Sequence, residues 1–174
     1  MLYETAARAE EILTLDIEDL DPEFWRARVT SKGGAVEYVH WATGTARLLP
    51  RLLRGRTAGP VFLASRRALP PGAARPPPKT SARSPDGGRL SYPRAEYLFK
   101  QASAALDPHK KGWTLHQLRH SALQHLAAGG RTAPELQAKS RHHLASLGRY
   151  VRLGEQTSAR VTAEADPAAR RRAR

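Results

Sequence analysis

The stretch from Thr114 to Tyr150 constrains the fold of this 174-residue chain most, because it carries two complete helix-start signals. In Thr114-Leu-His-Gln117 the hydroxyl and the amide side chain can each satisfy a free backbone N–H, which is the capping-box pattern. Thr132-Ala-Pro-Glu135 repeats this pattern eighteen residues later. Apolar residues recur at helical spacing after the first box, namely Leu115, Leu118, Ala122 and Leu126. Gly129-Gly130 favours a left-handed helix end, so the stretch predicts two helices, a short helical segment and then Tyr150.

This helical hairpin carries polar residues of the kind found in functional sites. His116 and Arg119 are three residues apart and would share one face of the first helix, beside its apolar stripe. Arg141, His142 and His143 follow the second helix. A tyrosine after a helix is more often a packing or surface residue, so Tyr150 alone predicts no chemistry.

The N-terminal part predicts a helix followed by a two-stranded finger. Met1–Leu13 has an apolar stripe at helical spacing (Leu2, Ala6, Ala9, Ile12 and Leu13), with Glu10 and Glu11 pointing outward. Arg8 and Glu11 are three residues apart, so the carboxylate can hold the guanidinium, and a surface ion pair is the simple alternative. Phe24–Thr30 and the alternating segment Val36–Trp41 predict strands joined by Ser31-Lys32-Gly33-Gly34. Lys32 would lie at the tip, where a lysine ordinarily serves only as a solvated charge.

The remaining segments complete an α+β chain that is mostly helical, with a small antiparallel hairpin sheet. Helices are predicted over Thr45–Leu53 and from Pro93 to about Leu106, the latter with Ala95, Leu98, Ala102 and Ala105 inward. Prolines mark residues 65–92 as an exposed basic insertion. We expect one domain over residues 1–155, and a C-terminal helix with an arginine-rich tail over 156–174.

The charge distribution points to a polyanionic partner. The net charge is +13 and the isoelectric point is about 11.0, although residues 1–37 hold nine acids and four bases. At this size the partner is expected to be nucleic acid, with no membrane and no small-molecule substrate. No cysteines and no run of membrane-spanning length are present, so we expect a soluble cytoplasmic protein associated with the nucleoid. Scarce aromatic residues argue against an RNA-binding sheet.

A metal-dependent site is the alternative interpretation of His116 and His120, which lie four residues apart. The zinc-protease pattern requires a glutamate where Gln117 stands, and Glu135 is the only acid in residues 108–154. The sequence therefore predicts neither a catalytic metal nor another cofactor.

Taken together, these residues resemble the tyrosine recombinases of the phage-integrase type, over nearly the whole chain but only over the catalytic half of a usual member. Thr5-Ala-Ala-Arg8-Ala-Glu-Glu11 is similar to the segment with the family's first catalytic arginine, and Lys32 to the lysine of its β-finger. His116-Gln-Leu-Arg119-His120 resembles the family's His-x-x-Arg box. His142 or His143 would be the later histidine and Tyr150 the nucleophile, so six roles occur in the family's order.

The resemblance implies metal-free DNA cleavage and rejoining through a 3′-phosphotyrosyl intermediate. Arg8 and Arg119 would bind the phosphate, Lys32 would protonate the departing 5′ oxygen, His116 would handle the phenol proton and His142 would hydrogen-bond the phosphate. Double-stranded DNA and further copies of the protein on it are the implied partners.

Three departures from the family pattern lead to a second hypothesis. We expect no N-terminal DNA-clamping domain before the first arginine. The sequence has the proline-rich insertion, and seven residues separate His142 from Tyr150 where the family has eight. We therefore expect a truncated mobile-element recombinase, and the alternative is a catalytically inactive DNA-binding remnant.

Overall fold

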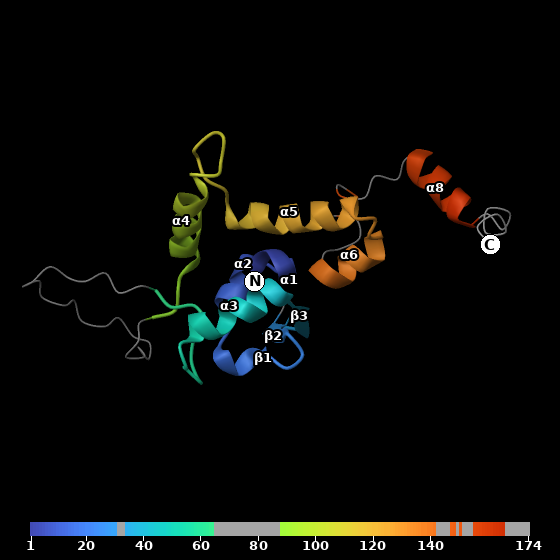
Figure 1. Ribbon diagram of the computed structural model, residues 1–174. Helices are drawn as coiled ribbons and strands as arrows, with labels where there is room; N and C mark the ends of the chain where they lie inside the picture. The colour runs from blue at the N-terminus through green and yellow to red at the C-terminus, as the bar shows by residue number, and fades with distance from the viewer. Residues whose placement is uncertain (31–33, 65–87, 142–146, 149, 151–154, 166–174) are drawn as a thin grey trace, which may run out of the picture. The chain divides into compact units, whose positions relative to one another are not determined.

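The computed structural model describes residues 1–30, 34–64, 88–141, 147, 148, 150 and 155–165, shown as coloured ribbon in Figure 1. Contacts divide the chain into two compact units, Met1–Ala122 and Leu123–Arg174. The first contains a small antiparallel sheet and most of the helices, which confirms the predicted α+β class. Most of the predicted proline-rich insertion, residues 65–87, lies outside the described part.

The sheet has three strands in the order β1-β2-β3, formed by Leu20–Asp21, Arg26–Thr30 and Val36–His40. The predicted finger is β2 paired with β3, with the buried residues Ala27 and Val39 opposite one another. Strand β2 begins at Arg26, whereas the sequence predicted that it would begin at Phe24. The reason is that Trp25 has a φ of 51°, a left-handed conformation that interrupts an extended chain.

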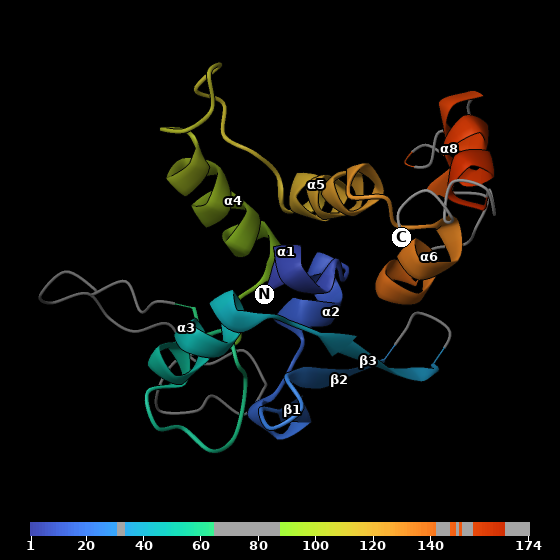
Figure 2. The ribbon, with the colours of Figure 1, turned by 45° about the vertical axis from the view of Figure 1, so that its right-hand side comes forward.

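Helices α1 (Leu2–Thr5) and α2 (Ala9–Leu13) lie beside the sheet, with α1 contacting β3 and α2 contacting β2 (Figure 2). The apolar core between these elements is small, in keeping with the modest hydrophobic fraction. Its buried members are Ala7, Ile12, Leu15, Ala27, Val29, Val39, Trp41, Leu49 and Val61.

The prediction of one helix over Met1–Leu13 is wrong. Ala6 has a φ of 50°, which ends α1, and the Thr5 hydroxyl accepts the Ala7 N–H at 3.2 Å. A second helix then begins after Arg8. Because the chain turns at this point, Ala6 and Ala7 are both buried and Arg8 stands at a helix start instead of on a helix side.

Helix α3, Thr43–Leu53, is capped from a distant part of the sequence. The Glu4 carboxylate accepts the N–H groups of Ala42 and Thr45 at 3.0 and 3.1 Å. Burial favours the neutral form of Glu4, but hydrogen bonds from Thr45 and Ala42 outweigh it and lower the pKa of the carboxyl. A Cβ at Gly44 would lie 2.6 Å from Glu4 Oε1, so a larger residue there would displace the capping carboxylate.

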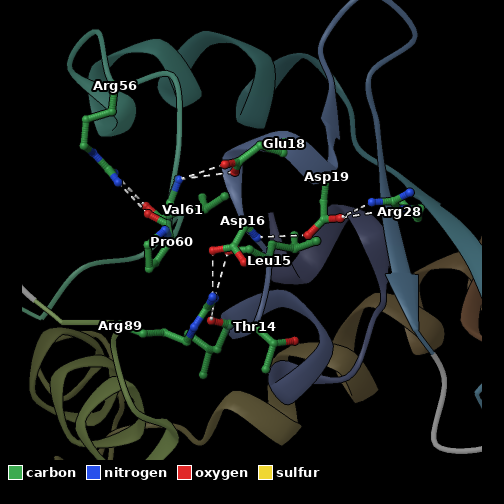
Figure 3. A network of polar contacts seen from close by, with 12 residues as sticks. Thr14, Leu15, Asp16, Glu18, Asp19, Arg28, Arg56, Pro60, Val61 and Arg89 are labelled. Carbon is green, nitrogen blue, oxygen red and sulfur yellow. Dashed lines mark hydrogen bonds and ion pairs between the residues drawn. The ribbon is translucent and has the colours of Figure 1, made fainter. Parts of the chain in front are cut away.

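Two arginines hold the segments that flank the insertion: Arg89 binds the N-terminal part, and Arg56 bonds within the segment before the insertion (Figure 3). Arg89 donates from Nη1 to the carbonyls of Leu13 and Leu15 at 3.2 and 3.0 Å, and from Nη2 to Asp16 at 2.7 Å. Asp16 precedes the short 3-10 helix η1, Ile17–Asp19. Arg56 donates to the carbonyls of Pro60 and Val61. The Val61 N–H also donates to the Leu15 carbonyl at 3.0 Å, so the chain contacts Leu15 on both sides of residues 65–87.

Helix α4, Tyr92–Ser103, buries a different face from the one predicted. Ala95 is inward as expected, but Leu98, Ala102 and Ala105 are exposed, whereas Ser103 is buried and Phe99 is partly buried. Ala95 packs with Leu13 and Leu115 in a second small core, with Phe99 against it. Ala95, Phe99 and Ser103 follow one another in four-residue steps, so they share the helix face that packs on that core. The exposed alanines are small and therefore lose little hydrophobic stabilisation.

Helix α5, Leu115–Ala128, begins in the first unit and ends in the second. The second unit continues with α6, Ala133–Ser140, and α8, Glu155–Ala165. Its buried side chains include Leu123, Leu136, Ser140 and Leu147. None of the described helices combines the length and the apolar character needed to cross a membrane.

Candidate functional site

Arg8 is positioned by the start of α2. The Glu11 carboxylate accepts both the Arg8 backbone N–H and the guanidinium Nη1 at 2.9 Å. Glu11 is therefore inward, not outward as predicted: its side chain is 7% exposed, against 47% for Arg8. The expected ion pair is present. The buried Glu11 carboxylate fixes the position of the Arg8 guanidinium, which remains partly exposed to solvent. A planar guanidinium with five N–H donors suits a phosphate or carboxylate ligand.

The start of α5 carries the His-x-x-Arg pattern, and both bonds of its predicted capping box are present. The Thr114 N–H donates to Gln117 Oε1 at 2.6 Å, and the Gln117 N–H donates to Thr114 Oγ1 at 3.1 Å. The next free N–H, that of Leu115, donates to the Glu96 carboxylate of α4 at 2.9 Å. Sequence reasoning missed Glu96, because its partner is nineteen residues away.

Burial separates the two predicted site residues of α5. Arg119 is 3% exposed and belongs to the buried stripe with Leu115 and Ala122, whereas His116 is exposed. A buried guanidinium requires polar contacts to offset its lost hydration, and Arg119 makes at least one such contact. Arg119 therefore lies inside the protein, whereas His116 is accessible.

His116 contacts His120 one helical turn further on. Their Nε2 atoms are 2.6 Å apart, and the rings meet edge to face with centroids 4.2 Å apart. No group of three or more metal-binding side chains occurs among the described residues.

The other predicted site residues are placed only in part. Lys32, His142 and His143 lie outside the described residues. Tyr150 is partly buried in a turn, where its N–H donates to the Leu147 carbonyl at 2.8 Å. Arg8, His116 and Arg119 belong to the first unit and Tyr150 to the second. Their convergence on one phosphate therefore stays a prediction.

A cavity of about 410 Å³ lies beside α3 in the first unit and contains none of the predicted site residues. Its lining is mainly apolar and includes Trp25, Trp41, Leu49 and Pro50.

Comparison with known proteins identifies the family. The model of the phage integrase family matches residues 1–156, so the chain belongs to that family. It is 31% identical over 135 residues to tyrosine recombinase XerD of Mycobacterium leprae (strain TN), covering 75% of this chain and 38% of XerD.

Solved structures share the fold. XerA recombinase matches 95% of this chain and 54% of its own, with a TM-score of 0.65 and 19% identity. The Tn1549 transposon integrase in complex with transposon right end DNA matches 94% and 55%, with a TM-score of 0.67 and 17% identity. XerH bound to difH substrate matches 93% and 44%, with a TM-score of 0.61 and 20% identity. The chain spans about half or less of the length of these relatives.

Proposed function

We propose that this protein is a site-specific DNA recombinase that cleaves and rejoins DNA strands through a covalent 3′-phosphotyrosyl bond to Tyr150. Membership of the phage integrase family carries this proposal. The DNA complexes of the Tn1549 integrase and XerH and the net charge of +13 support DNA as the substrate. Residues 1–155 would form the catalytic domain. Copies would associate on the DNA, and the protein would work in the cytoplasm on the nucleoid.

The chemistry follows from the residue types. Arg8 and Arg119 bind the non-bridging oxygens of the scissile phosphate and balance the charge that develops there. The Tyr150 oxygen attacks phosphorus and the bond to the 5′ oxygen breaks, so that the phosphate ester is conserved on the enzyme. The phenol proton passes to His116, and Lys32 protonates the departing oxygen. His142 or His143 donates a hydrogen bond to the phosphate. Rejoining reverses these steps, so neither a metal nor ATP is needed.

The Arg8–Glu11 contact supports the arginine's role in particular. A guanidinium held by a buried carboxylate keeps one orientation, and a fixed cation stabilises a transition state without reorganisation. Arg119 is 3% exposed and makes at least one polar contact, which also restricts its position.

A covalent trap tests the proposal. The protein is incubated with a nicked DNA substrate whose cleaved fragment diffuses away, and an adduct that survives denaturation is sought by electrophoresis. We expect an adduct that Tyr150→Phe abolishes. Tyr97→Phe is a matched control, because Tyr97 is an exposed residue of α4 outside the proposed site. Arg119→Lys should lower the adduct rate by about 10²–10³-fold.

The alternative is a catalytically inactive DNA-binding remnant, which the shortened His142–Tyr150 spacing favours. Removing one residue from a helical connection turns the following side chains by roughly 100°. DNA binding in a band-shift assay, without any adduct on a range of integrase recognition sites, would support the remnant and refute the recombinase.

A further inference from the structure

His116 and His120 form a close pair at the exposed side of α5. They lie one turn apart on the same helix face, and their Nε2 atoms are within 2.6 Å. A hydrogen bond at this distance requires an N–H on one ring and a bare nitrogen on the other, because two N–H groups facing each other would repel. Two imidazole nitrogens are thus already close together, one on the exposed His116 and the other on the partly buried His120.

The spacing is close to that of two ligands on one metal ion. Imidazole nitrogens bind zinc at about 2.0–2.1 Å, which places two of them about 2.9 Å apart at a right angle and about 3.4 Å apart in a tetrahedron. The observed separation of 2.6 Å therefore needs to increase by less than about 1 Å. A small rotation of the exposed His116 side chain can supply this change without moving the backbone.

We propose that His116 and His120 chelate a divalent first-row transition-metal ion. Each imidazole would keep its single proton on Nδ1, so that both Nε2 lone pairs face the ion. Imidazole favours copper, nickel and zinc, and the order of affinity predicts Cu²⁺ as the tightest ligand. Ca²⁺ and Mg²⁺ require oxygen ligands, and the described residues offer no carboxylate as a third member of this pair. Water fills the remaining coordination positions.

The site goes beyond the proposed reaction, which uses no metal, but it has a consequence for that reaction that rests on the proposed role of His116. An ion on His116 removes the imidazole as a proton acceptor for Tyr150. The metal therefore inhibits strand cleavage, and a chelator restores it.

Calorimetry on the tag-free full chain tests the site directly. Ni²⁺ or Cu²⁺ is titrated into wild-type protein, His116→Gln and His120→Gln, with circular dichroism confirming that the variants are folded. We expect one equivalent to bind in wild type, and affinity to fall on the order of 100-fold in each variant, because the second imidazole acts at high effective concentration. His125→Gln is the matched control on the same helix and keeps wild-type affinity.

Electron paramagnetic resonance of the Cu²⁺ complex gives a second readout: two coupled nitrogens in wild type and one in His120→Gln. If His120→Gln binds the metal ion as tightly as wild type, the proposal is wrong. It is also wrong if the double variant His142→Gln/His143→Gln, in which His120 is intact, no longer binds the ion. The adduct assay is then repeated with and without Ni²⁺. If wild type forms no adduct even without metal, the recombinase proposal fails, while the calorimetry still decides whether the site exists.

Discussion

Glu11→Gln is the most informative single substitution in this protein, because Glu11 connects the buried core to Arg8. The carboxylate accepts two hydrogen bonds at 2.9 Å, one from the Arg8 backbone and one from its guanidinium. A glutamine offers one oxygen in place of two and adds an NH₂ group that cannot accept. One of the two bonds is therefore lost, and the other loses its ionic character.

The magnitude follows from the burial of each partner. Hydrogen bonds to charged groups contribute about 1.5–3 kcal/mol. The guanidinium bond is worth less, about 0.2–1 kcal/mol, because the Arg8 side chain is 47% exposed. Losing that pair and weakening the backbone bond lowers the free energy of unfolding by about 1–2 kcal/mol, which is roughly a factor of 5–30 in the unfolding equilibrium.

Urea unfolding of wild type, Glu11→Gln and Glu10→Gln measures this effect. Glu10 is exposed in the same first helical turn, so its substitution makes the same charge change and alters the helix dipole interaction equally. We expect Glu10→Gln to change stability by less than about 0.5 kcal/mol. If both variants unfold at the same urea concentration, the buried contact does not anchor Arg8. In the adduct assay, Glu11→Gln should also slow cleavage by about 10–100-fold through misplacement of the guanidinium.

Four further substitutions probe the rest of the fold. Gly112→Ala should lower the free energy of unfolding by more than about 3 kcal/mol in the urea assay, because Gly112 has a φ of 70° and a Cβ would lie 2.0 Å from the Lys100 carbonyl oxygen. Gly130 has a φ of 83° but open space around it, so Gly130→Ala should lower the free energy of unfolding by only about 1–2 kcal/mol in the same assay. Leu123→Ala should cost about 2–5 kcal/mol in thermal or urea unfolding, because Leu123 is fully buried. Hydrogen bonds from backbone N–H groups, that of His109 foremost, lower the pKa of Asp107. The ionised Asp107 therefore stabilises the folded protein at neutral pH, and this contribution is lost as the pH falls through the lowered pKa. Asp107→Asn should accordingly reduce the loss of folding stability that is measured between about pH 5 and pH 2.

Sequence reasoning was accurate at the starts of α5 and α6 and at the end of α5, where the interacting groups are a few residues apart. The Thr114–Gln117 and Thr132–Glu135 capping boxes are both present. The glycine end of α5 is also confirmed, with Gly130 at a φ of 83°. These features depend on backbone geometry within one helical turn, which the residue types largely determine.

Prediction failed where burial depends on distant segments. The helix over residues 1–13 looked continuous because its apolar spacing is helical, but packing against the sheet favours a left-handed Ala6 and a break before Arg8. Ala95 was assigned correctly to the buried face of α4, yet Leu98 is exposed, since the second core lies on the side of Phe99.

The family, the basic character and the local contact between Arg8 and Glu11 can be predicted from the amino-acid sequence, because these depend on residue identity and short spacing. The burial of Glu11 and Arg119, and the capping of α3 by Glu4 and of α5 by Glu96, depend instead on the folded chain. This difference arises because a carboxylate or guanidinium is retained inside a protein only where folding brings polar partners to it, and those partners come from segments that no local pattern connects.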